Sequence, residues 1–151
     1  MKIGFIVNPI AGMGGPVGLK GTDNMVEKAI ALGAKPVAPQ RAMRFLKRVK
    51  ENGLAAGNMF ITCPGMMGEE EAKEVGIDAR ILPMRRKERT TAEDTKKAVV
   101  MLTSRSYHVD LIVFVGGDGT ARDIFDALEE RRREILVLWF SEGVIVYSGI
   151  F

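Results

Sequence analysis

The sequence predicts an α/β domain with an open parallel sheet and helices on both faces. Short apolar runs alternate along the chain with segments whose apolar residues recur at helical spacing. Strands and helices that alternate in this way form parallel sheets with right-handed crossovers. Two of the apolar runs lead directly into glycine-rich segments, as expected where a parallel strand ends beside a ligand.

Five short apolar runs are predicted to be strands, because they lack helical spacing and end at polar or turn-forming residues. The first ends at Asn8-Pro9, the third at Pro83, and the fourth, which is the clearest, at Gly116. The predicted strands are residues 2–7, 58–62, 79–82, 111–115 and 135–140.

Helices are predicted between these strands, where apolar residues recur every three or four positions. Gly33 ends the first helix, which contains Val26, Ala29 and Ile30. The second has an apolar stripe of Ala42, Phe45, Leu46 and Val49. Its basic residues, from Arg41 to Lys50, lie opposite this stripe, and we expect them on a solvated face.

Three further helices are predicted later in the chain. A short one covers residues 69–75 and ends at Gly76. Thr90 and Glu93 have capping-box spacing ahead of the next helix. Thr120 and Asp123 have the same spacing ahead of the last helix, whose inner face is Ala121, Ile124, Phe125 and Leu128.

Length and composition match one folded domain. Hydrophobic residues make up 46% and charged residues 27% of the 151 residues, so the chain lies outside the compositions that favour disorder. We expect residues 1–140 to form a nucleotide-binding α/β domain. We expect residues 141–151 to be an apolar tail, the truncated or altered start of a second domain that is missing.

The charge and cysteine content point to a small anionic ligand and a reducing compartment. Lys and Arg exceed Asp and Glu by 22 to 19, which is a mild excess for a nucleic-acid-binding protein. The single cysteine, Cys63, allows no internal disulfide, and no apolar run is long enough for a signal-peptide core or a membrane span. We therefore expect a cytoplasmic protein without nucleic-acid or membrane partners.

The strongest candidate site is Gly116-Gly117-Asp118-Gly119-Thr120, directly after the fourth strand. Glycines adopt backbone angles closed to other residues and let a phosphate approach the amide groups at a helix N-terminus. Asp118 would repel a phosphate unless it bound the accompanying Mg²⁺ or accepted a proton from an attacking hydroxyl. The structural alternative is that Asp118 caps the following helix.

Two other loops could contribute to binding. The segment after the first strand contains Asn8, Gly12, Gly14 and Gly15, and its glycine spacing is not that of a dinucleotide fingerprint. It is either a second phosphate-binding loop or an ordinary flexible loop. Arg85-Arg86-Lys87 follow the third strand, where they could reach a triphosphate or polyphosphate or form an exposed loop.

Four segments together resemble the amino-terminal domain of archaeal-type ATP- or polyphosphate-dependent NAD kinases. They are Asn8 to Gly15, Pro64 to Glu69, Thr90 to Thr95 and Gly116 to Asp123. The Gly-Gly-Asp-Gly element alone is shared with lipid kinases and phosphofructokinase-like enzymes, so the other segments carry the resemblance. In one departure, Trp139-Phe140-Ser141 stand where the family would have a Gly-Ile-Pro-type turn.

The resemblance implies a reaction and a set of site residues. Phosphoryl transfer from ATP or polyphosphate to the 2′-hydroxyl of NAD would give NADP, with Mg²⁺ as cofactor. Asp118 would be the catalytic carboxylate, and a carboxyl-terminal β-rich domain would supply much of the NAD site. The remaining ligand-binding residues would be Asn8, Gly12, Gly14, Gly15, Thr91, Asp94, Gly116, Gly117, Gly119 and Thr120.

Two other functions stay open from the sequence. The chain could be a nucleotide-binding module that is catalytically incomplete without a carboxyl-terminal domain, or, as a more distant alternative, a relative of lipid kinases. An exposed apolar strand such as residues 144–147 invites pairing with another chain, so we also expect a homo-oligomer that forms through the tail.

Overall fold

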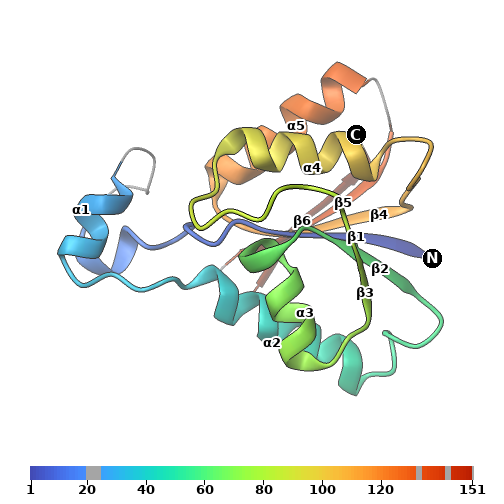
Figure 1. Cartoon of the computed structure of the whole chain (residues 1–151), viewed down its shortest axis with the longest axis horizontal. Coiled ribbons are helices and arrows are strands. Elements are labelled where there is room, and N and C mark those ends of the chain that lie inside the picture. The colour runs from blue at the N-terminus through green and yellow to red at the C-terminus, as the bar shows by residue number, and fades with distance from the viewer. Residues whose placement is uncertain (20–24, 132–133, 142–143, 151) are drawn as a thin grey trace.

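A six-stranded sheet runs through the centre of the computed structural model, which describes residues 1–19, 25–131, 134–141 and 144–150 (Figure 1). The strands are β1 (Lys2–Val7), β2 (Met59–Thr62), β3 (Ala79–Ile81), β4 (Leu111–Val115), β5 (Leu136–Ser141) and β6 (Val144–Ile150). Their order across the sheet is β3-β2-β1-β4-β5-β6. Strands β1 to β5 pair in parallel, which confirms the predicted parallel sheet, and β6 pairs antiparallel to β5.

Helices cover both faces of the sheet, as predicted (Figure 1). One face carries α2 (Ala38–Glu51) and α3 (Glu69–Val75), and the other carries α4 (Ala92–Leu102) and α5 (Asp118–Arg131). Side chains alternate between the faces, so Ile6 packs in the core beneath α4 and α5 while Phe5 and Val7 pack in the core beneath α2. Because both faces are covered, β4 is apolar throughout and β1 is apolar after Lys2.

The strand order brings two loops together at one edge of the sheet. From β1 the chain continues to β2 and β3 on one side of β1, and it then returns to form β4 on the other side. Helices α2 and α3, which lie between β1 and β3 in the chain, therefore cover one face of the sheet, and α4 and α5, which lie between β3 and β5, cover the other. The change of side falls between β1 and β4. Open α/β sheets bind ligands at this point. The loops after β1 and β4 start side by side, since the amide of Asn8 donates to the carbonyl of Val115 at 2.9 Å.

The beginnings of two helices differ from the expected caps. The N-cap of α4 is Thr91 and its partner is Asp94, one residue later than the expected Thr90 and Glu93. In this register the Asp94 carboxylate accepts hydrogen bonds from the Thr91 amide at 2.9 Å and from Lys87 Nζ at 2.6 Å. Helix α5 begins at Asp118, so Thr120 lies in its first turn and is not its cap.

Helix α1 (Val26–Ala31) stands apart from the sheet (Figure 1). Ala29 is buried, but Ile30 is 53% exposed, so the predicted apolar face of this helix is only partly covered. Within the described part of the chain, no helix combines the length and apolarity that a membrane span requires.

The apolar tail extends the chain's own sheet. Strand β6 is hydrogen bonded to β5, so one edge of the expected exposed strand is paired within the molecule. The predicted tail also includes residues 142, 143 and 151, which lie outside the described residues. Trp139, where the family resemblance would place a turn, lies inside β5 beside a bulge between Trp139 and Phe140.

Candidate functional site

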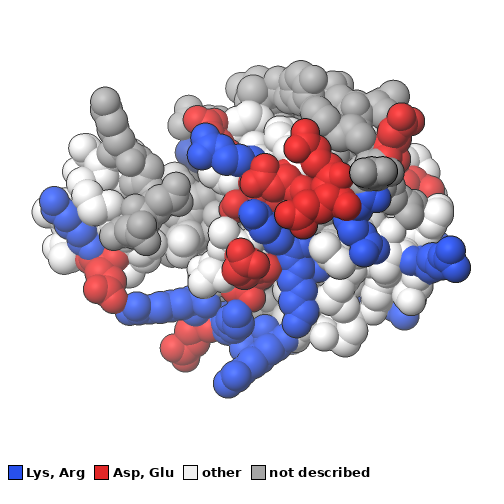
Figure 2. Space-filling model, turned by 90° about the horizontal axis from the view of Figure 1, so that it is seen from above, with Lys and Arg blue, Asp and Glu red and all other residues white. Residues whose placement is uncertain are grey.

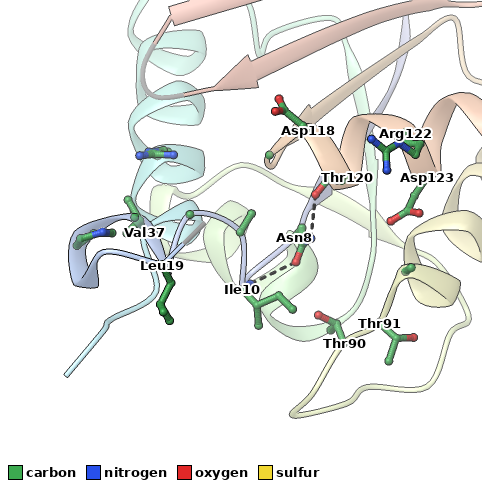
Figure 3. A pocket seen from close by; sticks show the side chains of 18 residues that line it. Asn8, Ile10, Leu19, Val37, Thr90, Thr91, Asp118, Thr120, Arg122 and Asp123 are labelled. Carbon is green, nitrogen blue, oxygen red and sulfur yellow. Dashed lines mark hydrogen bonds between the residues drawn. The ribbon is translucent and has the colours of Figure 1, made fainter. Parts of the chain in front are cut away.

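A pocket of about 650 Å³ opens at the edge of the sheet where β1 and β4 end (Figure 3). This volume lies within the range of roughly 300–1,000 Å³ that is usual for small-molecule sites. Four parts of the chain line it: the loop after β1, the start of α2, the residues before α4, and the first turns of α5. The lining residues are Asn8, Ile10, Ala11, Gly12, Gly15, Pro16, Leu19, Val37, Arg41, Thr90, Thr91, Ala92, Gly117, Asp118, Gly119, Thr120, Arg122 and Asp123.

The two glycines between β4 and α5 have different surroundings. A Cβ atom on Gly116 would lie 2.5–2.7 Å from three atoms of the Thr120 side chain, a distance at which atoms overlap. A Cβ atom on Gly117 would meet no atom within 4 Å, and Gly117 lines the pocket. Gly116 therefore makes room for Thr120, whereas Gly117 leaves its backbone open to a ligand.

Asp118 is exposed in the pocket at the first position of α5 (Figure 3). The amide groups in the first turn of a helix lack acceptors inside that helix and attract anions. Next to an open glycine, the arrangement suits a phosphate group with a carboxylate at its side. As the first residue of α5, Asp118 is inside the helix and does not occupy the cap position considered from the sequence.

A hydrogen bond joins the two glycine-containing loops. Asn8 Nδ2 donates to Thr120 Oγ1 at 2.8 Å, and Asn8 Oδ1 accepts from the amide of Ile10 at 3.3 Å (Figure 3). Thr120 is buried at the wall of the pocket, and its hydroxyl accepts this hydrogen bond. Asn8 and Thr120 thus fix the loop after β1 against the first turn of α5.

The family model of the ATP-NAD kinase N-terminal domain matches residues 3–151. The chain belongs to this family. Searches of curated proteins and of solved structures found no match. Membership confirms the resemblance at the level of NAD kinases and makes the chain an NAD kinase-like phosphotransferase domain, in a family that uses ATP and NAD.

The loop after β1 in this NAD kinase domain presents some of its glycines to the pocket. Gly12 and Gly15 line it, and Gly12 has φ +77°, a conformation that favours glycine. A Cβ atom on Gly15 would meet no atom within 4 Å. Gly14 is buried and does not line the pocket.

The two candidates near α4 have separate positions in the NAD kinase domain. Thr91 lines the pocket, whereas Asp94 is buried, does not line it, and is bound to Lys87 and to the Thr91 amide. Burial raises the pKa of Asp94, but the hydrogen bonds from Lys87 and Thr91 outweigh it and lower that pKa below the ordinary value. Asp94 therefore holds the start of α4.

Sequence reasoning missed Arg41 as a pocket residue. It was expected on a solvated face, yet it is half-buried and lines the pocket. Its Nη1 lies 3.4 Å from the position of a Cβ atom on Gly12. The available signal was its place in the first turns of α2, the end of that helix nearest the loop after β1. Arg44, three residues later, is exposed as expected.

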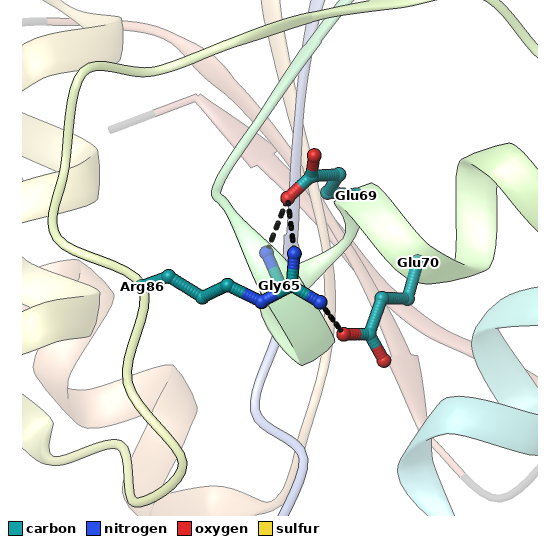
Figure 4. A network of polar contacts seen from close by, with 4 residues as sticks. All are labelled: Gly65, Glu69, Glu70 and Arg86. Atoms are coloured by element: carbon teal, nitrogen blue, oxygen red, sulfur yellow. Dashed lines mark hydrogen bonds and ion pairs between the residues drawn. The ribbon is translucent and has the colours of Figure 1, made fainter.

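Two of the three predicted basic residues after β3, Arg86 and Lys87, are held by carboxylates outside the pocket. Arg86 is paired with Glu70 and lies 3.7 Å from Glu69, whose Oε2 accepts the Gly65 amide at 2.6 Å (Figure 4). Lys87 is paired with Asp94. The surface over α4 and α5 likewise mixes acidic and basic side chains (Figure 2). For Arg86 and Lys87 the geometry is that of an exposed structural loop.

The pocket also offers ligands for magnesium. Groups of three or more His, Cys, Asp or Glu side chains arranged for a metal are absent from the described residues. Asp118 and Asp123 nevertheless both line the pocket. Mg²⁺ is usually bound through one or two carboxylates together with substrate phosphates, so either carboxylate could hold it beside a bound phosphate.

Proposed function

We propose that this domain carries out the phosphoryl transfer of an NAD kinase, with Asp118 as the general base. The donor is ATP or polyphosphate, and the acceptor is the 2′-hydroxyl of the adenosine ribose of NAD. The observation that carries the proposal is an exposed carboxylate beside an open glycine at a helix N-terminus, within one pocket. Family membership supports the reaction class.

The proposed reaction needs one proton acceptor and a place for the phosphates. The 2′-hydroxyl oxygen forms a bond to the terminal phosphorus, its proton passes to the Asp118 carboxylate, and the bond to the leaving phosphate oxygen breaks. Gly117, Gly119 and the first amides of α5 hold the phosphates. With Asp118 as the base, Asp123 would hold Mg²⁺ together with the phosphates, and Mg²⁺ when bound neutralises charge on them.

The closing test compares two aspartates on the same helix. Asp118→Asn removes the proton acceptor at an exposed position, so we expect an unchanged melting temperature and a loss of NADP formation of at least about 10²-fold. Asp126→Asn is the control, because Asp126 pairs with Lys96 at 3.5 Å and does not line the pocket. NADP is measured by enzymatic cycling with NAD, Mg²⁺ and either ATP or polyphosphate.

Nucleotide binding is measured on the same samples by calorimetry, since the resemblance implies that a carboxyl-terminal domain supplies much of the NAD site. Full activity in Asp118→Asn would reject the catalytic assignment. Saturable binding of ATP or NAD without turnover in the parent chain would favour the alternative, a nucleotide-binding module. A parent chain that binds neither nucleotide would reject both.

A further inference from the structure

Arg41 is a half-buried cation without a counter-charge in the described part of the chain. Three basic residues between β3 and α4 illustrate the contrast, because Arg86, Lys87 and Arg89 are each paired with a carboxylate. For Arg41 no ion pair or hydrogen bond of the guanidinium exists with any described residue, although it lines the pocket. Removing a charge from water is costly unless a partner compensates, so this position is suited to an anion.

The guanidinium is held beside the glycine loop. Its Nη1 and Cζ lie 3.4 and 3.9 Å from the position of a Cβ atom on Gly12. These are ordinary van der Waals distances, so the guanidinium lies directly against Gly12, whose φ of +77° favours glycine. A guanidinium presents several N–H groups in one plane and binds phosphate oxygens through two of them at once.

Thr90 supplies a second, independent indication that the pocket receives a polar ligand. It lines the same pocket and is 9% exposed, and its Oγ1 has no hydrogen-bond partner within the described residues. Buried hydroxyl groups in native proteins are nearly always hydrogen bonded. Thr90 and Arg41 come from different elements, and both present donors that the chain's described residues do not satisfy.

We infer that Arg41 binds a phosphate group of the substrate on the Gly12 side of the pocket, with the Thr90 hydroxyl as a further donor. The inference rests on the proposed function to the extent that the pocket receives a nucleotide or polyphosphate. It also gives the phosphate chain a direction: from the group held by Gly117 and the start of α5, beside Asp118, the chain runs toward Arg41 and Gly12.

The test measures binding, so it does not depend on turnover. Calorimetric titrations with tripolyphosphate, ATP and NAD are run on the parent chain, Arg41→Gln, Arg41→Lys and Arg44→Gln. We expect Arg41→Gln to weaken at least one phosphate ligand by about 10- to 100-fold, as for other hydrogen bonds to charged groups. Arg41→Lys keeps the charge but loses the planar fork, and its affinity should be intermediate. Arg44→Gln should stay within about twofold of the parent.

The three ligands identify the phosphate that Arg41 contacts. If Arg41→Gln weakens the binding of tripolyphosphate and ATP, Arg41 contacts the phosphates of the donor. If it weakens only the binding of NAD, Arg41 contacts the pyrophosphate of the acceptor. Unchanged affinity for all three in both Arg41 variants, with parent-like melting temperatures, would overturn the inference while the proposed function stands. An equal loss of affinity in Arg44→Gln would also overturn the inference, because the loss would then come from the lower net positive charge and not from a contact of Arg41 with the ligand. Failure of the parent chain to bind any of the three overturns the proposed function itself.

Discussion

Asn8 Nδ2 lies 2.8 Å from Thr120 Oγ1, a contact between residues 112 positions apart in the sequence. It ties the loop after β1 to the first turn of α5 on two sides of the pocket. We expect a double-mutant cycle with Asn8→Ala and Thr120→Val to give a coupling of about 0.5–1.5 kcal/mol in the free energy of unfolding. Urea denaturation measures it, and additive effects of the two substitutions would show that the contact contributes nothing to stability.

An alanine substitution should lower the stability of the domain at Gly116 but weaken nucleotide binding at Gly117. Gly116→Ala places a methyl group 2.5–2.7 Å from the Thr120 side chain, so we expect it to destabilise the domain by about 1–3 kcal/mol. Gly117→Ala meets no neighbour within 4 Å, so it should fold like the parent and weaken nucleotide binding instead. Thermal unfolding and calorimetry on both variants check this. Parent-like stability in Gly116→Ala would contradict the packing argument.

Trp139 is the single tryptophan of the chain, and its indole Nε1 donates to the Gly116 carbonyl at 2.8 Å. Its ring also stacks on Phe114, with centroids 5.9 Å apart. Because Gly117, the next residue, lines the pocket, we expect ATP to change the tryptophan emission in a saturable way with the same Kd as calorimetry gives. The quenching by adenine itself is controlled with free tryptophan. If ATP binds by calorimetry but the emission of Trp139 stays constant, the phosphates lie elsewhere.

Glu71 should make the domain less stable as the pH rises toward neutrality. It is 3% exposed, its Oε2 has no partner among the described residues, and burial raises its pKa to about 7. The folded state thus binds a proton that the unfolded state, with a pKa of 4.5, has released. The resulting loss of stability accumulates between those two pKa values and amounts to on the order of 3 kcal/mol above them.

Glu71→Gln should abolish this decline, because an amide is neutral at every pH in that range. The free energy of unfolding in urea is compared at several pH values between about 4.5 and 8. Glu74→Gln, an exposed position on the same helix, should keep the parent's pH dependence. An unchanged slope in Glu71→Gln would assign the pH dependence to other groups.

The sequence predicted the sheet and the region of the site because both depend on local patterns. Apolar runs that end in glycine segments define strands that deliver loops to one edge, and Asp118 and Gly117 do line the pocket there. The antiparallel direction of β6 relative to β5 could also have been predicted from the sequence. Only residues 142 and 143 separate β5 from β6, which is too short for a parallel crossover and leaves antiparallel pairing.

Other features depend on tertiary contacts that periodicity does not encode. Thr90 and Thr91 each begin a segment with capping-box spacing, and the choice of Thr91 follows the burial of Asp94 against Lys87. Helical periodicity separates the outer side of α2 from its core side but says nothing about the loop that folds over its first turn. Arg41 was assigned to solvent for that reason.

The contact of Gly116 with Thr120 bears on how this motif is interpreted in other proteins. A Cβ atom at residue 116 would overlap the Thr120 side chain, so the turn itself requires this pair whether or not a phosphate binds. A match to Gly-Gly-Asp-Gly-Thr therefore indicates the turn and does not by itself indicate the chemistry. The residue that distinguishes an enzyme from a domain with the turn alone is the aspartate, because it is the only ionisable side chain of the five-residue motif and it lines the pocket.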